Sequence, residues 1–234
     1  MTRALVILVL AAGCGSRPAL DYGRALFDDA SVSSAASNTF KCSTCHEVAA
    51  MPTTLKAGYT LHDSAARPAF WGGSVPALYD ATNQCITQFM RGKALAADDE
   101  KGRALFVYLQ SESPDASAPL LPLTVVQNIT NVKSGDATRG QATYQQACGT
   151  CHGQPHTGEG RLGTVVSIIP DESLQAHGTD PITGARPITI EKVRHGKFFN
   201  IGGNMPLFSV EALPDADLGD VLAYLEMFGL PPSP

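Results

Sequence analysis

Apolar residues near the end of the chain recur at helical spacing. A helix over residues 217–227 places Leu218, Val221, Leu222 and Leu225 on one apolar stripe, which Phe228 directly after it continues. Such a stripe is typical of an amphipathic helix that packs against a core. Asp215 is the expected N-cap of this helix and Gly229 its expected end, because carboxylates favour helix starts and glycine favours helix ends.

Two further segments, residues 75–91 and 99–110, show helical periodicity. A short strand pattern covers residues 164–169. Most of the remaining chain is rich in glycine and proline, which is typical of loops. The 234-residue chain is therefore predicted to be an all-α protein with short helices and long loops.

The same order of helical segments occurs twice along the chain. Tyr22–Phe27 and Arg139–Tyr144 are amphipathic segments that carry a glycine at their second position. The last helix expected in each half carries an aromatic-leucine pair, Tyr108-Leu109 in the first half and Tyr224-Leu225 in the second. This repetition indicates two copies of one helical unit.

The segment between the two copies, residues 111–119, is rich in serine, alanine and proline and lacks periodicity. That composition is typical of a linker. We predict a first domain over residues 15–113, a linker over 114–124 and a second domain over 125–234.

One five-residue signature occurs in each half, Cys42-Ser43-Thr44-Cys45-His46 and Cys148-Gly149-Thr150-Cys151-His152. C-x-x-C-H is the attachment sequence for c-type haem. Its cysteines lie one helical turn apart and form thioethers to the porphyrin, and its histidine is the proximal ligand of the iron. The sequence predicts two covalently bound haem c groups, held by Cys42 and Cys45 and by Cys148 and Cys151, with His46 and His152 on the irons.

A Cys-x-x-Cys pair also occurs in disulfides, redox-active dithiols and zinc sites. A zinc site needs a fourth ligand for each Cys-Cys-His set. A redox dithiol typically lies beside a βαβ unit, and the pattern predicts none. A doubled signature on a chain that is expected to be exported favours haem.

Met205 is the candidate sixth ligand of the second haem. It lies in Gly202-Gly203-Asn204-Met205-Pro206, 53 residues after His152. This segment resembles the Met-Pro loop of class I cytochromes c, and the resemblance implies that the Met205 thioether binds the second iron, a ligation that raises the reduction potential. The alternative is that Met205 fills a gap in the core. His195 is a rival ligand, but its Lys and Arg neighbours indicate a surface turn.

The first half contains no Met-Pro loop. The candidate sixth ligands of the first haem are therefore Cys85, Met90 and another group such as His62. The first half resembles the dihaem thiosulfate dehydrogenases and related sulfur-oxidising cytochromes. The resemblance lies in four short segments: Asn83-Gln84-Cys85, Gly92-Lys93-Ala94-Leu95, Asp98-Asp99-Glu100 and Tyr108-Leu109. It implies that Cys85 is the distal ligand of a catalytic haem. The alternative is that Met90 binds the iron and Cys85 is a small buried apolar residue.

Three cations, Arg67, Arg91 and Lys93, lie near Cys85 in the sequence. They are candidates for binding haem propionates or an anionic substrate. Solvent exposure is the expectation for all three. Trp71 is expected to pack against a porphyrin edge.

The first 14 residues are typical of an export signal. A short basic start precedes an apolar run over residues 4–12, which is too short to span a bilayer. The small residues before Cys14 resemble a bacterial lipobox, which implies a lipid anchor at Cys14 on a membrane surface. The alternative is an ordinary signal peptide cut elsewhere. Both predict a periplasmic protein.

Charge excludes one class of function. The chain carries 17 Lys and Arg against 22 Asp and Glu, a net charge of −5, and no basic tract, so it has no electrostatic footprint for nucleic acid. The sequence favours an electron carrier between periplasmic or membrane redox proteins. A thiosulfate dehydrogenase-like enzyme that forms tetrathionate is the alternative, and a fixed subunit of a membrane respiratory complex is a third possibility.

Overall fold

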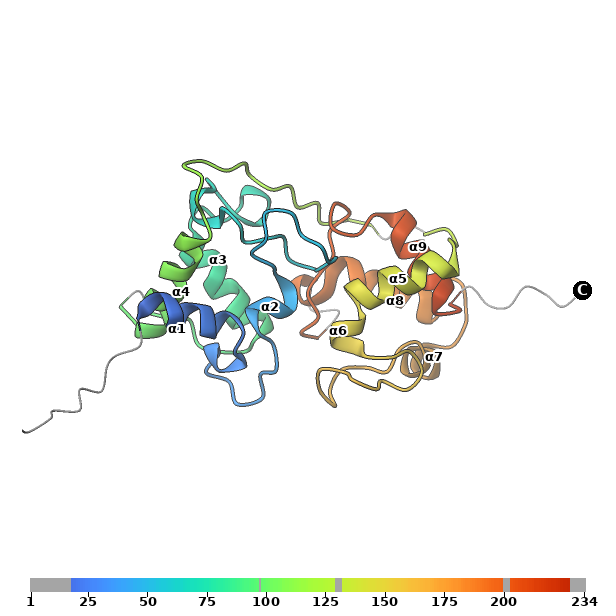
Figure 1. Ribbon diagram of the computed structural model, residues 1–234. Coiled ribbons are helices and arrows are strands. Elements are labelled where there is room, and N and C mark those ends of the chain that lie inside the picture. Colours follow the sequence, from blue (N-terminus) through green and yellow to red (C-terminus); the bar gives the residue numbers. More distant parts are fainter. Residues whose placement is uncertain (1–17, 97, 129–131, 200–202, 228–234) are drawn as a thin grey trace, which may run out of the picture.

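The structure is a computed structural model that describes residues 18–96, 98–128, 132–199 and 203–227 (Figure 1). It confirms the all-α prediction, because these residues form helices and loops, and the strand-like pairing found among them is an isolated bridge between Phe70 and Val75. No helix in the described part of the chain is long and apolar enough to span a bilayer. The expected leader with Cys14, and also Gly202 and Gly229, lie outside the described residues.

Nine α-helices are formed by the described residues. Those of the first half are α1 (Ala19–Phe27), α2 (Cys42–Cys45), α3 (Leu78–Gln84) and α4 (Glu100–Ser111). Those of the second half are α5 (Ala137–Ala147), α6 (Gly149–His152), α7 (Asp171–His177), α8 (Ala185–His195) and α9 (Asp215–Tyr224). Short 3-10 turns are η1 (Ala30–Val32), η2 (Ser64–Ala66), η3 (Trp71–Gly73) and η5 (Gly196–Phe199), and a π-helical turn, η4 (Cys85–Phe89), continues α3.

One pair of crossed helices builds each half. α1 packs against α4 in the blue-to-green part of Figure 1, and α5 packs against α9 in the yellow-to-red part. A glycine lies at each crossing. A Cβ atom on Gly23 would lie 2.0 Å from the carbonyl oxygen of Ala104, and one on Gly140 would lie 1.9 Å from that of Asp220. Glycine is required at both positions because any side chain would collide with the backbone of the facing helix.

The same aromatic contact lies beside each crossing. The rings of Phe27 and Tyr108 are 5.6 Å apart and tilted by 60°, and those of Tyr144 and Tyr224 are 5.6 Å apart and tilted by 59°. Tilted rings at this separation are a favourable arrangement of two aromatic side chains. The repeated sequence pattern therefore corresponds to repeated packing.

The buried apolar residues form two clusters. The first contains Leu26, Val32, Ile86, Met90, Leu105 and Leu109. The second contains Tyr144, Ile190, Leu213, Leu218, Leu222 and Leu225. Leu55 and Ala57 belong to the first half but pack against the second cluster. The two halves therefore share an apolar contact.

Three details of the expected elements were wrong. The helix expected over residues 75–91 begins at Leu78, because Val75 pairs with Phe70, and its backbone widens into the π-helical turn at Cys85. The strand expected over residues 164–169 is a loop that has no partner strand among the described residues. Asp215 lies inside the first turn of α9, whose N-cap is the preceding proline.

The segment between the halves is bound by hydrogen bonds to side chains of the two halves, although its composition is typical of a flexible linker. The Tyr59 hydroxyl donates to the Pro122 carbonyl at 2.7 Å, and Nε2 of His195 lies 2.6 Å from the Val126 carbonyl oxygen. Backbone carbonyls near a protein surface are commonly paired in this way. Pro122 and Val126 are therefore each bound by a side chain, one from the first half and one from the second. Figure 1 shows the course of this segment as the green trace along the upper edge.

A buried carboxylate joins α9 to the start of α5 and gives stability that depends on pH. Asp220 accepts hydrogen bonds from the Asp136 backbone N–H at 2.6 Å and from Nε and Nη2 of Arg139 at 2.8 and 2.9 Å. The bond from Arg139 is the largest cause that lowers the pKa of Asp220 below its ordinary value of 3.8. The stabilisation is therefore complete above that value and is lost as the pH falls through the lowered pKa.

Asp220→Asn should lower the free energy of unfolding at neutral pH by about 1–2 kcal/mol, because charge-assisted hydrogen bonds are replaced by weaker ones. Urea unfolding measures the difference from wild type, and that difference should shrink as the pH is lowered below 3.8 and through the lowered pKa of Asp220. Asp21→Asn, at an exposed position in the first turn of α1, is the matched control. An equal loss at all pH values would contradict this account.

Candidate haem sites

Each C-x-x-C-H motif folds as a single helical turn. The backbone N–H of His46 donates to the Cys42 carbonyl at 2.9 Å, and that of His152 donates to the Cys148 carbonyl at 2.9 Å. The turn places the two cysteines of a motif on one side of the backbone, three residues apart. We call Cys42, Cys45 and His46 the first site, and Cys148, Cys151 and His152 the second site.

Both motif histidines are oriented by the same type of hydrogen bond. Nδ1 of His46 lies 2.7 Å from the Tyr59 carbonyl oxygen, and Nδ1 of His152 lies 2.9 Å from that of Ser167. A carbonyl only accepts, so Nδ1 carries the proton and Nε2 keeps its lone pair for a metal. Burial lowers the pKa of both imidazoles, which keeps them neutral. Each histidine is thus prepared to bind iron through Nε2.

The motif cysteines are half-buried, protonated thiols. Burial raises the pKa of Cys42 and of Cys148 to about 12, and it also raises the pKa of Cys45 and Cys151. Redox-active dithiols instead have lowered pKa values. None of the five described cysteines forms a disulfide, and no group of three His, Cys, Asp or Glu side chains placed to hold a bare metal ion is found in the described ranges.

The first site opens into a large apolar cavity with about 1350 Å³ of empty space, part of it open to solvent. Cys42, Cys45 and His46 all line it. Its walls are mainly aromatic and aliphatic, and include Phe40, Leu61, Leu78, Ile86, Leu105 and Leu109. A cavity of this size and character, with two thiols and an imidazole at one wall, fits a haem.

Backbone packing beside His46 also depends on a glycine. A Cβ atom on Gly58 would lie 2.2 Å from Cε1 and 2.4 Å from Nδ1 of the His46 ring. The backbone at Gly58 therefore passes directly along the imidazole, which brings the carbonyl of the next residue, Tyr59, to Nδ1. Gly58 is a positioning residue of the first site that the sequence pattern did not reveal.

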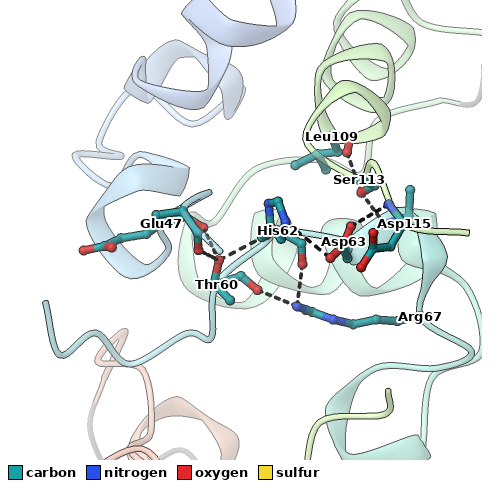
Figure 2. Close-up of polar contacts among 10 residues, drawn as sticks. Glu47, Thr60, His62, Asp63, Arg67, Leu109, Ser113 and Asp115 are labelled. Atoms are coloured by element: carbon teal, nitrogen blue, oxygen red, sulfur yellow. Dashed lines mark hydrogen bonds and ion pairs between the residues drawn. The ribbon is translucent and has the colours of Figure 1, made fainter. Parts of the chain in front are cut away.

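Arg67 lies at the wall of the same cavity and is half-buried, so the expectation that it is solvent-exposed was wrong. Figure 2 shows that its Nη2 donates to the carbonyls of Thr60 and His62, at 2.9 and 2.7 Å. Its Nε is buried and has no hydrogen-bond partner. A buried N–H in this position fits the carboxylate of a haem propionate. Arg91 and Lys93 are exposed, as expected.

The loop that carries Arg67 is braced against the end of α4. Figure 2 shows the Asp63 carboxylate accepting from the Asp115 backbone N–H at 3.1 Å, and the buried Ser113 hydroxyl donating to the Leu109 carbonyl at 2.8 Å. Nε2 of His62 lies 3.3 Å from the Asp63 carboxylate. His62 is outside the set of described residues that line the cavity, whereas Arg67 is held in it.

Cys85 and Met90 both line the first cavity, so the structure brings both candidate ligands to the site of His46. Burial raises the pKa of Cys85 to about 11. Cys85 is the first residue of the π-helical turn, and Met90 directly follows its last residue. The Met90 N–H donates to the Cys85 carbonyl at 3.2 Å and closes the turn. Such turns occur frequently at functional sites. The choice between the two ligands stays a prediction.

The Asn83-Gln84-Cys85 segment has a structural role as well. The Asn83 side chain accepts from the Leu95 N–H at 2.8 Å and donates to the Leu95 carbonyl at 3.3 Å. It thereby folds the Gly92–Leu95 segment back over α3. Trp71 lines the cavity and stacks on Phe89 at 6.2 Å, so these two rings form part of its wall.

Met205 packs against the second apolar cluster together with Cys148, which places it in the half that holds the second site. Its carbonyl accepts from the Lys197 N–H at 2.8 Å. Gly196, with φ of 49°, allows this approach, because a Cβ there would lie 2.5 Å from the Met205 oxygen. The loop is therefore fixed to the end of α8.

His195 does not lie on a surface turn, contrary to expectation. It is 7% exposed, and its Nε2 is directed to the Val126 carbonyl. The adjacent Arg194 is 2% exposed, because its guanidinium donates to the carbonyls of Phe208 and Leu213 and to the Asp215 carboxylate. The Arg194 guanidinium can be buried at this helix end because backbone oxygens and a carboxylate accept its hydrogen bonds.

These features define an all-α protein with haem-binding motifs, and sequence comparison gives the class of its second half. Residues 135–225 match the family described as cytochrome c oxidase, cbb3-type, subunit III. This part of the chain is therefore a cytochrome c domain, which implies covalently bound haem c and transfer of electrons to redox partners.

Two further comparisons are less informative. No curated protein matches the chain. A solved structure of thiosulfate dehydrogenase TsdBA from Marichromatium purpuratum, in its as-isolated form, is 18% identical with a TM-score of 0.42. The match covers 88% of this chain and 45% of the other, so the chain spans less than half the length of that protein. A likeness this distant says nothing about substrate.

Proposed function

We propose that this protein is an exported dihaem c-type cytochrome that passes single electrons between redox partners. The observation that supports it most is the shared geometry of the two motif turns. In both, a histidine directly after the second cysteine has its Nδ1 on a backbone carbonyl, 13 residues further on in one case and 15 in the other. The repeated helix crossings support the same cofactor in both halves.

In this proposal Cys42 and Cys45 hold one haem c and Cys148 and Cys151 hold the other. His46 and His152 bind the irons on one side, and Met205 binds the second iron on the other. Haem iron supplies one-electron exchange between its ferric and ferrous states. The chain supplies ligands, an apolar environment and orientation, and no atom is transferred to a substrate.

The two motifs lie near each other, which supports the passage of an electron between them in this proposal. Burial raises the pKa of Cys45, and the nearby Cys151 thiol raises it further. The side chain of Thr39 lies 3.8 Å from where a Cβ atom of Gly163 would be, so loops beside the two motifs also meet. One electron from a reduced donor would enter at one haem, move to the other and leave to an oxidised acceptor.

We further propose that the protein is exported and attached to a membrane. Export and attachment rest on the sequence of residues 1–14, with Cys14 as the lipid-bearing residue and the periplasm as the compartment. The net charge of −5 suits a basic partner protein, whose approach it would accelerate at low salt.

A reductive titration of the full chain isolated from its native membranes tests the function. The intact mass should show two added haem groups, and the protein should take up two electrons and return them to an artificial acceptor. One haem, or none, would overturn the dihaem proposal. Acceptor reduction that depends on added thiosulfate would replace the carrier by the sulfur-oxidising alternative, in which Cys85 is a catalytic ligand.

The sixth ligand of the first iron can be assigned by substitution at the two candidate positions. If Cys85 is the ligand, Cys85→Ser should change one of the two low-spin signals in the electron paramagnetic resonance spectrum of the oxidised protein, and Met90→Leu should change neither. The physical reason is that thiolate and thioether ligands give the iron different electronic environments. The reverse result would assign Met90, and an unchanged spectrum in both variants would exclude both residues.

A further inference from the structure

The cavity of the first site is completed by residues from outside the first half. Leu121 and Leu123 of the connecting segment line it, and so do Pro206 and Leu207, which directly follow Met205. The loop that carries the candidate ligand of the second iron is thus also a wall of the first cavity. The chain therefore offers a physical connection between the two sites.

Asn204 makes the polar contact in this connection. Its Nδ2 donates to the Phe89 carbonyl at 3.1 Å, across 115 positions of sequence. Phe89 is the last residue of the π-helical turn that begins at Cys85, and it directly precedes Met90. The last carbonyls of a helical turn lack partners within the turn, so an external donor fixes the position of that end.

The loop that follows Asn204 is also fixed in position. Met205 is the direct neighbour of Asn204, and the Met205 carbonyl is bound by the Lys197 N–H at the end of α8. Asn204 itself is only partly buried, whereas Met90 is 5% exposed and its carbonyl accepts from the Ser33 hydroxyl at 2.9 Å. A displacement at one end of this short connection therefore reaches the other, since the Ser33 hydroxyl holds the Met90 end and the Lys197 N–H holds the Met205 end.

We propose that Asn204 is a positioning residue that couples the two haem sites, because it holds the Cys85–Met90 segment in register with the Met205 loop. The proposal rests on the dihaem function. Its consequence is that the redox properties of the first haem depend on a side chain of the second half. Asn204 need not touch either haem to have this effect.

The test uses the full-length protein with both haems, in which Asn204→Ala removes the donor and Asn204→Asp replaces it by an oxygen of similar size. Spectroelectrochemistry and low-temperature electron paramagnetic resonance measure the two haems separately. In both variants the equilibrium constant for sharing one electron between the haems should change by about fivefold, the effect expected when a hydrogen bond is lost. The signal of the first haem should move, whereas the His/Met signal should stay.

Asn128→Ala, the same change at an exposed position of the second half, is the matched control and should leave both signals unchanged. If both haems are present and the Asn204 variants leave the first haem unchanged, or alter the His/Met signal alone, the coupling is disproved. A wild-type protein with fewer than two haems would instead disprove the dihaem function, so the two failures are distinguishable.

Discussion

Changing Cys42 and Cys45 to alanine should leave a protein with one covalently bound haem, and changing Cys148 and Cys151 should do the same at the other site. Each haem c is held by the thioethers of one motif, so loss of both thiols removes its attachment. Intact mass and the absorbance of the pyridine haemochrome measure the number of haems per chain.

The variant that lacks Cys42 and Cys45 should also be much less stable than wild type. Its apolar cavity would lose the group that fills it, and the residues of the first cluster that line this cavity would lose their contacts with that group. Cys85→Ala is the matched control, because it removes a cavity thiol outside the motif and should keep both haems. Two haems in either double variant would show that the motif cysteines do not hold them.

Adding one methyl group at a helix crossing should have the second largest effect. In Gly140→Ala the new Cβ would lie 1.9 Å from the Asp220 carbonyl oxygen, and in Gly23→Ala it would lie 2.0 Å from that of Ala104. Alanine is the better helix former by about 1 kcal/mol. The steric overlap outweighs this gain, because it can be relieved only by moving two packed helices apart. The free energy of unfolding should therefore fall by about 3 kcal/mol.

Thermal or urea unfolding of the haem-loaded protein measures this loss. Gly163→Ala is the matched control, since the nearest atom to its new Cβ would be 3.8 Å away on Thr39, an ordinary contact. Equal stability of Gly140→Ala and Gly163→Ala would mean that the helices separate easily, and that the close crossing does not support the fold.

The sequence was sufficient for those parts of the fold that repeat. The glycine in each opening helix and the aromatic-leucine pair in each closing helix predicted helices that the structure confirms. The glycine spacing was informative because a side chain cannot fit at these crossings. The π-helical turn at Cys85 was not predictable, since hydrophobic periodicity does not distinguish a helical turn of larger radius over five residues.

The candidate ligands on the motif turns followed from sequence because their spacing is local. The groups that orient the motif histidines could not be predicted from the sequence. They are the backbone carbonyls of Tyr59 and Ser167, and every residue has a backbone carbonyl. Arg67 was seen as a candidate cation, but its burial depends on loop packing that no periodic pattern records. Asn204 was seen only as a neighbour of Met205, since its partner Phe89 lies far away in sequence.

The shared wall of the first cavity has a consequence for the order in which the protein matures. Synthesis proceeds from the N-terminus, so Cys42 and Cys45 emerge well before Pro206 and Leu207. The first attachment motif is therefore made long before the residues that complete the wall of its cavity. Any truncation before residue 206 would leave that wall permanently incomplete.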